Sequence, residues 1–219
     1  VNASYISSES RRIQTGSNLN GLYLGYLRTA PDFDITDYKG DYVSNSGAIT
    51  QSRHRSYRRY LGNSDNAIYN NPLWTVNEQE SSANVNRLIG TGEANYRWND
   101  NISTILRGGV DFYADSRVYF FPYYSAGAAR RYGLINDETI NNQEFSSDLL
   151  TSFRYQLAEK LNSNVIVGFG LNDRRRKRNF TTADNFIANF RKPLDPAEIA
   201  AKENISSETT RTSRRNIRF

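Results

Sequence analysis

The side chains of this chain that could do chemistry are few, and they do not favour catalysis. A serine–histidine–acid system needs an imidazole base, and His54 is the single histidine. Cysteine is absent, which excludes disulfides and thiolate metal ligands. No glycine-rich phosphate loop is present, and two carboxylates at glycosidase separation cannot be recognised from sequence alone. The sequence therefore predicts no enzyme, no catalytic residue, no metal site and no cofactor.

His54 belongs to a loose basic cluster with Arg53, Arg55, Arg58 and Arg59. Positive neighbours make an imidazole lose its proton more readily. We expect this cluster to lie on an exposed surface loop, and we assign it no role.

Two runs of residues are suited to binding. The first is aromatic and contains Tyr119, Phe120, Phe121, Tyr123 and Tyr124. Flat aromatic faces suit sugar rings or an apolar patch on a partner, so this run and Trp74 are predicted to contact a substrate or a partner protein. The alternative is that the rings pack a loop against its neighbours.

The second run, residues 174–178, is strongly basic and could bind phosphate. A nucleic-acid site would need interleaved aromatic residues or a known motif, and the run has neither. The net charge of +5 is also modest. No nucleic-acid partner is expected, and the alternative to phosphate binding is a solvated strand end.

The elements that would position these residues are strands, because four segments alternate apolar and polar residues: 87–97, 102–112, 148–157 and 164–172. One face of these strands would carry Leu88, Tyr96, Trp98, Leu106, Val110, Phe112, Leu149, Phe153, Tyr155, Val165, Val167, Phe169 and Leu171. The other face would carry the charged residues Glu93, Arg97, Arg107, Asp111 and Arg154.

Tight turns at 98–101 and 158–161 join these strands in pairs, whereas residues 14–82, 117–143 and 174–207 read as long loops. Short helices are expected at 17–27 and 196–202, and irregular structure at 32–71. Strands near 1–8 and 209–219 bring the total to about six, fewer than the roughly eight that the smallest outer-membrane barrels need. We expect residues 1–219 to be one part of a larger barrel domain.

Alternating tight turns and long loops are typical of a transmembrane β-barrel. A hydrophobic fraction of 37% and a mean hydropathy of −0.71 are too polar for a helical membrane protein, but they suit a wall with one wet face. The apolar face would then contact lipid and the charged face the lumen. Tyr96 and Trp98 would belong to an aromatic girdle, or else be ordinary half-buried aromatics. The charged residues would form structural ion pairs or, alternatively, select substrate.

Four segments carry a family resemblance: 17–31 (SNLNGLYLGYLRTAP), 71–75 (NPLWT), 86–90 (NRLIG) and 107–113 (RGGVDFY). In this order they resemble the SusC-like (RagA-like) TonB-dependent outer-membrane receptors of Bacteroidetes. The resemblance implies an antiparallel barrel of about 22 strands, of which this chain is a central slice. The plug domain and the part that contacts TonB would lie outside it.

The resemblance also implies a function and partners. A receptor of this family imports oligosaccharides or peptides across the bacterial outer membrane, with a SusD-like lipoprotein as its lid and TonB as its energy source. Outer-membrane lipid and lipopolysaccharide would surround the wall, and the phosphates available to the basic run 174–178 would be those of lipopolysaccharide. The alternative is a soluble or secreted β-rich module that binds glycans; an enzyme domain on a β scaffold is supported by no residues.

Overall fold

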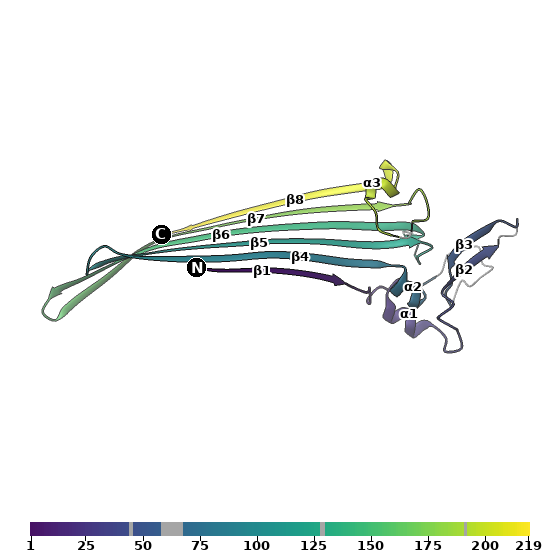
Figure 1. Ribbon diagram of the computed structural model, residues 1–219, viewed down its shortest axis with the longest axis horizontal. Coiled ribbons are helices and arrows are strands. Elements are labelled where there is room, and N and C mark those ends of the chain that lie inside the picture. The colour runs from purple at the N-terminus through teal and green to yellow at the C-terminus, as the bar shows by residue number, and fades with distance from the viewer. Residues whose placement is uncertain (44–45, 58–67, 128–129, 191) are drawn as a thin grey trace.

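The computed structural model describes residues 1–43, 46–57, 68–127, 130–190 and 192–219. A six-stranded antiparallel sheet dominates it, in the order β1-β4-β5-β6-β7-β8 (Figure 1). Strands make up 63% and helices 10% of the structure, which confirms the all-β class. The strands are β1 (Asn2–Arg11), β4 (Glu80–Arg97), β5 (Ile102–Tyr123), β6 (Tyr132–Ala158), β7 (Leu161–Asp184) and β8 (Ile205–Arg218).

Both predicted tight turns are confirmed. In the turn between β4 and β5, the side-chain oxygen of Asn99 accepts hydrogen bonds from the backbone N–H groups of Asn101 and Ile102, each at 2.8 Å. An asparagine that bonds the backbone two residues on is a usual way to close a tight turn. The turn between β6 and β7 is equally short, with Ala158 paired to Leu161.

Two of the predicted long loops are wrong in extent. β5 continues to Tyr123 and β6 begins at Tyr132, so most of residues 117–143 is strand. β7 likewise continues through the basic run to Asp184. In these parts polar side chains occupy both faces: Thr139 lies opposite Asn179 on one face, and Asn142 lies opposite Arg176 on the other. The apolar–polar alternation that identifies a half-buried strand is therefore missing, although the backbone pairing continues.

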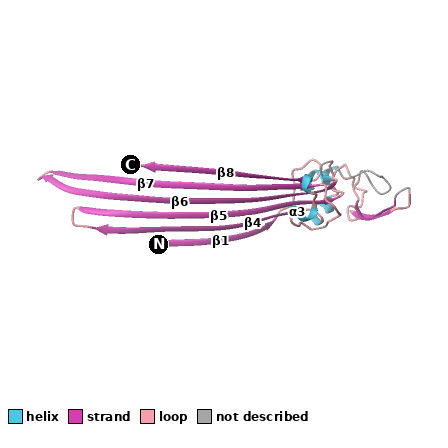
Figure 2. Ribbon diagram, turned by 90° about the horizontal axis from the view of Figure 1, so that it is seen from above, coloured by secondary structure: helices cyan, strands magenta, loops and turns pink. Residues whose placement is uncertain are grey.

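The segments between the long strands gather at one end of the sheet, and the tight turns lie at the other (Figures 1 and 2). The first end, which we call the rim, holds α1 (Leu22–Arg28), α2 (Pro72–Asn77), α3 (Pro196–Ile199), a 3-10 turn (Lys202–Asn204) and the hairpin of β2 (Lys39–Val43) and β3 (Ile49–His54). No helix within the described ranges is long and apolar enough to cross a membrane.

The predictions for the rim are partly confirmed. The expected helix at 17–27 begins only at Leu22, and the one at 196–202 is divided between α3 and the 3-10 turn. The prediction of irregular structure at 32–71 is wrong where β2 and β3 pair. Residues 58–67, which include Arg58 and Arg59, lie outside the described part of the chain.

A small hydrophobic core forms where the connection between β7 and β8 folds over the ends of β5, β6 and β7. It contains Phe120, Ile135, Ala183, Phe186, Ile199 and Ala200. The rings of Phe120 and Phe186 stack with their centroids 5.7 Å apart. The backbone N–H of Phe186 also donates to the carbonyl of Tyr132 at 2.9 Å. This core fixes the connection against the sheet.

Replacing Gly133 with alanine should release this connection. Gly133 has a φ of +88°, and a Cβ there would lie 2.1 Å from the ring of Phe186. Backbone strain of this kind costs about 1–3 kcal/mol, and the clash adds to it. We expect trypsin to cleave more rapidly after Lys202 in the Gly133→Ala protein.

Gly92→Ala is the matched control, because a Cβ at Gly92 meets no atom within 4 Å. Equal cleavage of the two variants would contradict the proposed role of Gly133.

Candidate functional site

Cross-strand register places the predicted apolar residues on one face of the sheet, which we call the Leu106 face. Leu106 lies opposite Ala94 on β4 and Leu149 on β6, and Leu149 lies opposite Phe169 on β7. Residues opposite one another point to the same side of a sheet. The same face therefore holds Leu88, Tyr96, Val110, Phe112, Phe153, Tyr155, Val165, Val167 and Leu171.

The apolar part of this face is exposed and uncharged. Leu106 is 51% exposed and Val167 is 59% exposed. On β5 the side chains of the Leu106 face are uncharged from Ile102 to Phe112. A tilted strand crosses the hydrocarbon of a bilayer in about 9–11 residues, counted over both faces, and this segment of β5 has that length. Exposed apolar surfaces of this extent usually mark a contact with another molecule or with lipid.

Aromatic side chains border the apolar part at the tight-turn end. The rings of Tyr96 and Trp98 meet edge to face, with their centroids 4.7 Å apart. The indole N–H of Trp98 donates to the hydroxyl of Thr104 at 2.9 Å, and Thr104 belongs to the Leu106 face. An aromatic ring with a satisfied polar edge is suited to a boundary between an apolar and a wet region.

The opposite face carries the charges, and we call it the Arg107 face. It holds Glu93, Arg97, Arg107, Asp111 and Arg154, as predicted from the alternation. Arg107 donates to Glu93 at 2.8 Å, and Arg87 binds both carboxylate oxygens of Asp111 at 2.9 and 2.6 Å. These side chains are partly exposed, so water screens each pair and its contribution to stability is small. The pairs make this face wet and charged.

Nearer the rim, the Arg107 face has a longer network that the sequence analysis missed. The buried carboxylate of Asp115 accepts hydrogen bonds from Tyr113 at 2.7 Å and from Arg117 at 2.6 Å. Glu138 on β6 accepts from Arg178 on β7 at 2.5 Å, and it lies opposite Arg117 in the sheet. The negative charges of these two carboxylates are neutralised by the positive charges of the two guanidinium groups. Extending the alternation beyond residue 112 could have found these residues.

His54 is buried, so the prediction that it lies on an exposed surface loop is wrong. Its ring stacks on that of Trp74, with centroids 4.4 Å apart. The Nδ1 atom lies 3.0 Å from the carbonyl of Tyr124, and Nε2 accepts from the backbone N–H of Asn71 at 3.0 Å. These partners require a neutral ring with its proton on Nδ1. The pKa of His54 is lowered to about 3, mainly because burial removes the water that would stabilise the charged ring.

Buried amide side chains connect three parts of the rim around His54. Asn20 donates to the carbonyl of Ala126 at 2.6 Å, and Asn70 accepts from the N–H of Ala126 at 2.8 Å. Thr75 receives a hydrogen bond from Asn70 and donates to the carbonyl of Asn20. These bonds hold α2 and the segment before α1 against the turn between β5 and β6. No period in the sequence signals them, because they join residues from distant loops.

The structure does not place the aromatic run in a loop. Phe120 and Phe121 are buried in β5, and Trp74 is fully buried, with its indole N–H donating to Ser125 at 3.3 Å. These three residues therefore cannot reach a ligand at the surface, and the packing alternative holds for them. Tyr119, Tyr123 and Tyr124 are half-buried. The hydroxyl of Tyr123 donates to the carbonyl of Phe186.

Comparison with known proteins identifies no family. The sequence matches no protein-family model, and a search of curated proteins finds no match. The resemblance to SusC-like receptors therefore stays a prediction.

The buried His54 predicts a pH-dependent rim. Its pKa is about 3 when folded and near 6.5 when unfolded, so the unfolded state binds more protons between these values. The stability that the neutral ring provides is complete above pH 6.5 and is lost as the pH falls toward 3. We expect hydrogen-exchange protection of the Asn71 amide and of α2 to fall across this window, after correction for the intrinsic exchange rate.

His54→Gln supplies the control. Exchange protection in this variant should be weaker than in the wild type at neutral pH. Because glutamine does not titrate, this protection should not change further between pH 6.5 and 5. A wild-type protein whose α2 protection is constant over that range would contradict a buried neutral imidazole.

Proposed function

We propose that this chain forms part of the wall of a transmembrane β-barrel in a bacterial outer membrane. The observation that carries the proposal is the division of one sheet into two faces. The Leu106 face is uncharged over the length that a bilayer requires, and the Arg107 face behind it is lined with ion pairs. Such a wall suits lipid on one side and a water-filled lumen on the other.

The pairing of the strands supports a wall that continues beyond this sheet. Among the described residues, β1 pairs only with β4 and β8 pairs only with β7, so the sheet has two free edges. In lipid each unpaired backbone group costs several kcal/mol, and only a closed barrel avoids free edges. We propose that further strands complete the barrel, to about 22 in all.

We further propose that the barrel belongs to a SusC-like, TonB-dependent receptor that imports glycans or peptides. The four family-like segments occur in the family's order, and they fall on α1, α2, β4 and β5. A SusD-like lipoprotein would cover the rim, and TonB would act through a part of the receptor outside this chain. Tyr119, Tyr123 and Tyr124 keep partly exposed rings at the rim and are the proposed contacts for lid or substrate.

The second candidate is a soluble or secreted β-rich module that binds glycans. The exposed rim helix α1 favours it, because Tyr23 and Tyr26 are more than 60% exposed and could stack on sugar rings. A soluble module would, however, have to cover the Leu106 face with protein. Extraction of the full-length protein separates the two candidates, since the barrel should need detergent and the module should not.

A charge on the Leu106 face should block membrane assembly. Leu106 lies in the middle of the apolar part of β5, and an arginine there would cost about 2–4 kcal/mol at the centre of a bilayer. We expect Leu106→Arg in the full-length protein to reduce the outer-membrane fraction and to remove the heat-dependent shift in gel mobility that folded barrels show.

Arg107→Gln is the neighbouring control. It removes only an exposed ion pair with Glu93, which water screens, so little stability should be lost. Assembly of this variant should be close to that of the wild type. The reverse order, with Arg107→Gln blocking assembly and Leu106→Arg tolerated, would show that the two faces are assigned to the wrong sides.

A further inference from the structure

The basic run on β7 does not form a single patch. Successive side chains point to opposite faces, so Arg175 and Lys177 lie on the Leu106 face and the other three cations of the run lie on the Arg107 face. On β8, Arg211 and Arg215 also belong to the Leu106 face. Two strands thus combine four cations on one side, of which the sequence analysis recognised only two.

These four residues, which we call the basic cluster, are only partly neutralised. Asp173 accepts hydrogen bonds from Arg175 and from Arg215, each at 3.1 Å. Lys177 and Arg211 lie directly opposite each other and form no ion pair with any described residue. Like charges in this position repel each other unless an anion lies between them.

A shallow groove at the basic cluster could hold such an anion. Its volume is about 510 Å³, and its lining includes Arg175, Lys177 and Arg211. Besides Arg176, Thr212 and Ser213, the groove is lined by Asn141 and Gln143 on β6. Their amide N–H₂ groups can donate to the oxygens of an anion, while the cations neutralise its charge. This combination suits a phosphate group.

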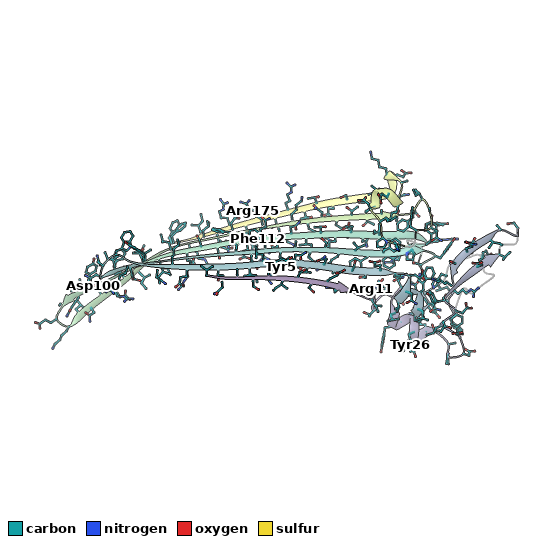
Figure 3. The ribbon with its side chains drawn as sticks, viewed as in Figure 1. Tyr5, Arg11, Tyr26, Asp100, Phe112 and Arg175 are labelled. Carbon is teal, nitrogen blue, oxygen red and sulfur yellow. The ribbon has the colours of Figure 1, made fainter. Side chains whose placement is uncertain are left out.

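A second groove, of about 250 Å³, favours a lipid as the source of that phosphate. It is lined by the apolar side chains of Val110, Phe112 and Phe145 and by Glu144, Asp173, Gln143 and Arg175, of which the last two also line the first groove. Figure 3 shows Phe112 and Arg175 at a similar distance along the sheet. A free phosphate ion would use only the basic groove. An acyl chain joined to a phosphate would use both.

The basic cluster also lies at a suitable height for a headgroup. Leu171 and Ile217 are the last apolar pair on β7 and β8 below it. Arg175 follows Leu171 by four residues, about 13 Å along a strand or roughly 10 Å along the membrane normal at a tilt of about 40°. The polar layer of a bilayer extends over a comparable distance beyond the hydrocarbon.

We propose that the basic cluster binds the phosphate of an anionic lipid whose acyl chain lies over Phe112 and Phe145. The inference rests on the proposed function, because it needs the Leu106 face to contact lipid. It adds a specific lipid site to the wall, shared by β7 and β8 and continued onto β5 and β6 by the two grooves.

The test compares two double variants of the full-length protein in phosphatidylcholine nanodiscs that contain phosphatidic acid. Lys177→Gln/Arg211→Gln removes the two cations of the basic cluster that form no ion pair with any residue in the described part of the chain. Native mass spectrometry measures how much phosphatidic acid stays bound relative to phosphatidylcholine. We expect the apparent affinity for phosphatidic acid to fall about 25-fold, because each of the two cations near an anionic lipid contributes roughly a fivefold factor.

Arg174→Gln/Arg214→Gln is the matched control, because these two arginines lie opposite each other on the same strands but on the Arg107 face. It should retain phosphatidic acid within about twofold of the wild type. Equal retention by all three proteins, or equal loss in both variants, would overturn the inference. So would displacement of the lipid by excess inorganic phosphate, since the site would then take the free ion.

Assembly of the wild type is measured first, by its need for detergent and its heat-dependent gel mobility. A wild-type protein that stays soluble without detergent overturns the proposed function and this inference together. An inserted wild-type protein whose lipid retention is unaffected by Lys177→Gln/Arg211→Gln overturns this inference alone.

Discussion

The pleat of the paired backbone is the constraint on which the rest of the structure depends. Each strand places successive side chains on opposite sides, and the hydrogen-bonded register carries this order to the next strand. A shift of one residue between β4 and β5 would bring Arg107 among the leucines and Leu106 among the ion pairs. Both faces of the wall, its aromatic border and the basic cluster therefore depend on one register.

The rim is held by a different kind of interaction. Around His54, buried hydrogen bonds between amide side chains and backbone groups join loops that are distant in the sequence. A polar group buried in this way is stabilising only while its partners are in place. The sheet can tolerate many changes of side chain at its exposed positions, whereas the rim depends on a few particular donors and acceptors.

This difference explains how much of the structure could be predicted from sequence. The strands that contain Leu106 and Phe169 were found because one of their faces is apolar. The chain between Tyr132 and Gln143 was missed because polar side chains occur on both of its faces and the alternation is lost. Asn20 and His54 follow no period, so their burial could not be foreseen. The alternation implies that residues 174–178 are divided between two faces. Predicting this division, however, required knowing that the strand continues through them.

In the proposed barrel, the length of β6 determines how far the rim stands from the membrane. The strand continues from Phe145 to Tyr132, about 13 residues or 40 Å beyond the apolar part of its face. With a tilt of about 40°, the rim would stand some 30 Å above the hydrocarbon. A large solute or a partner protein would then first contact the rim, beyond the lipid headgroups and at the height of any polysaccharide coat of the cell.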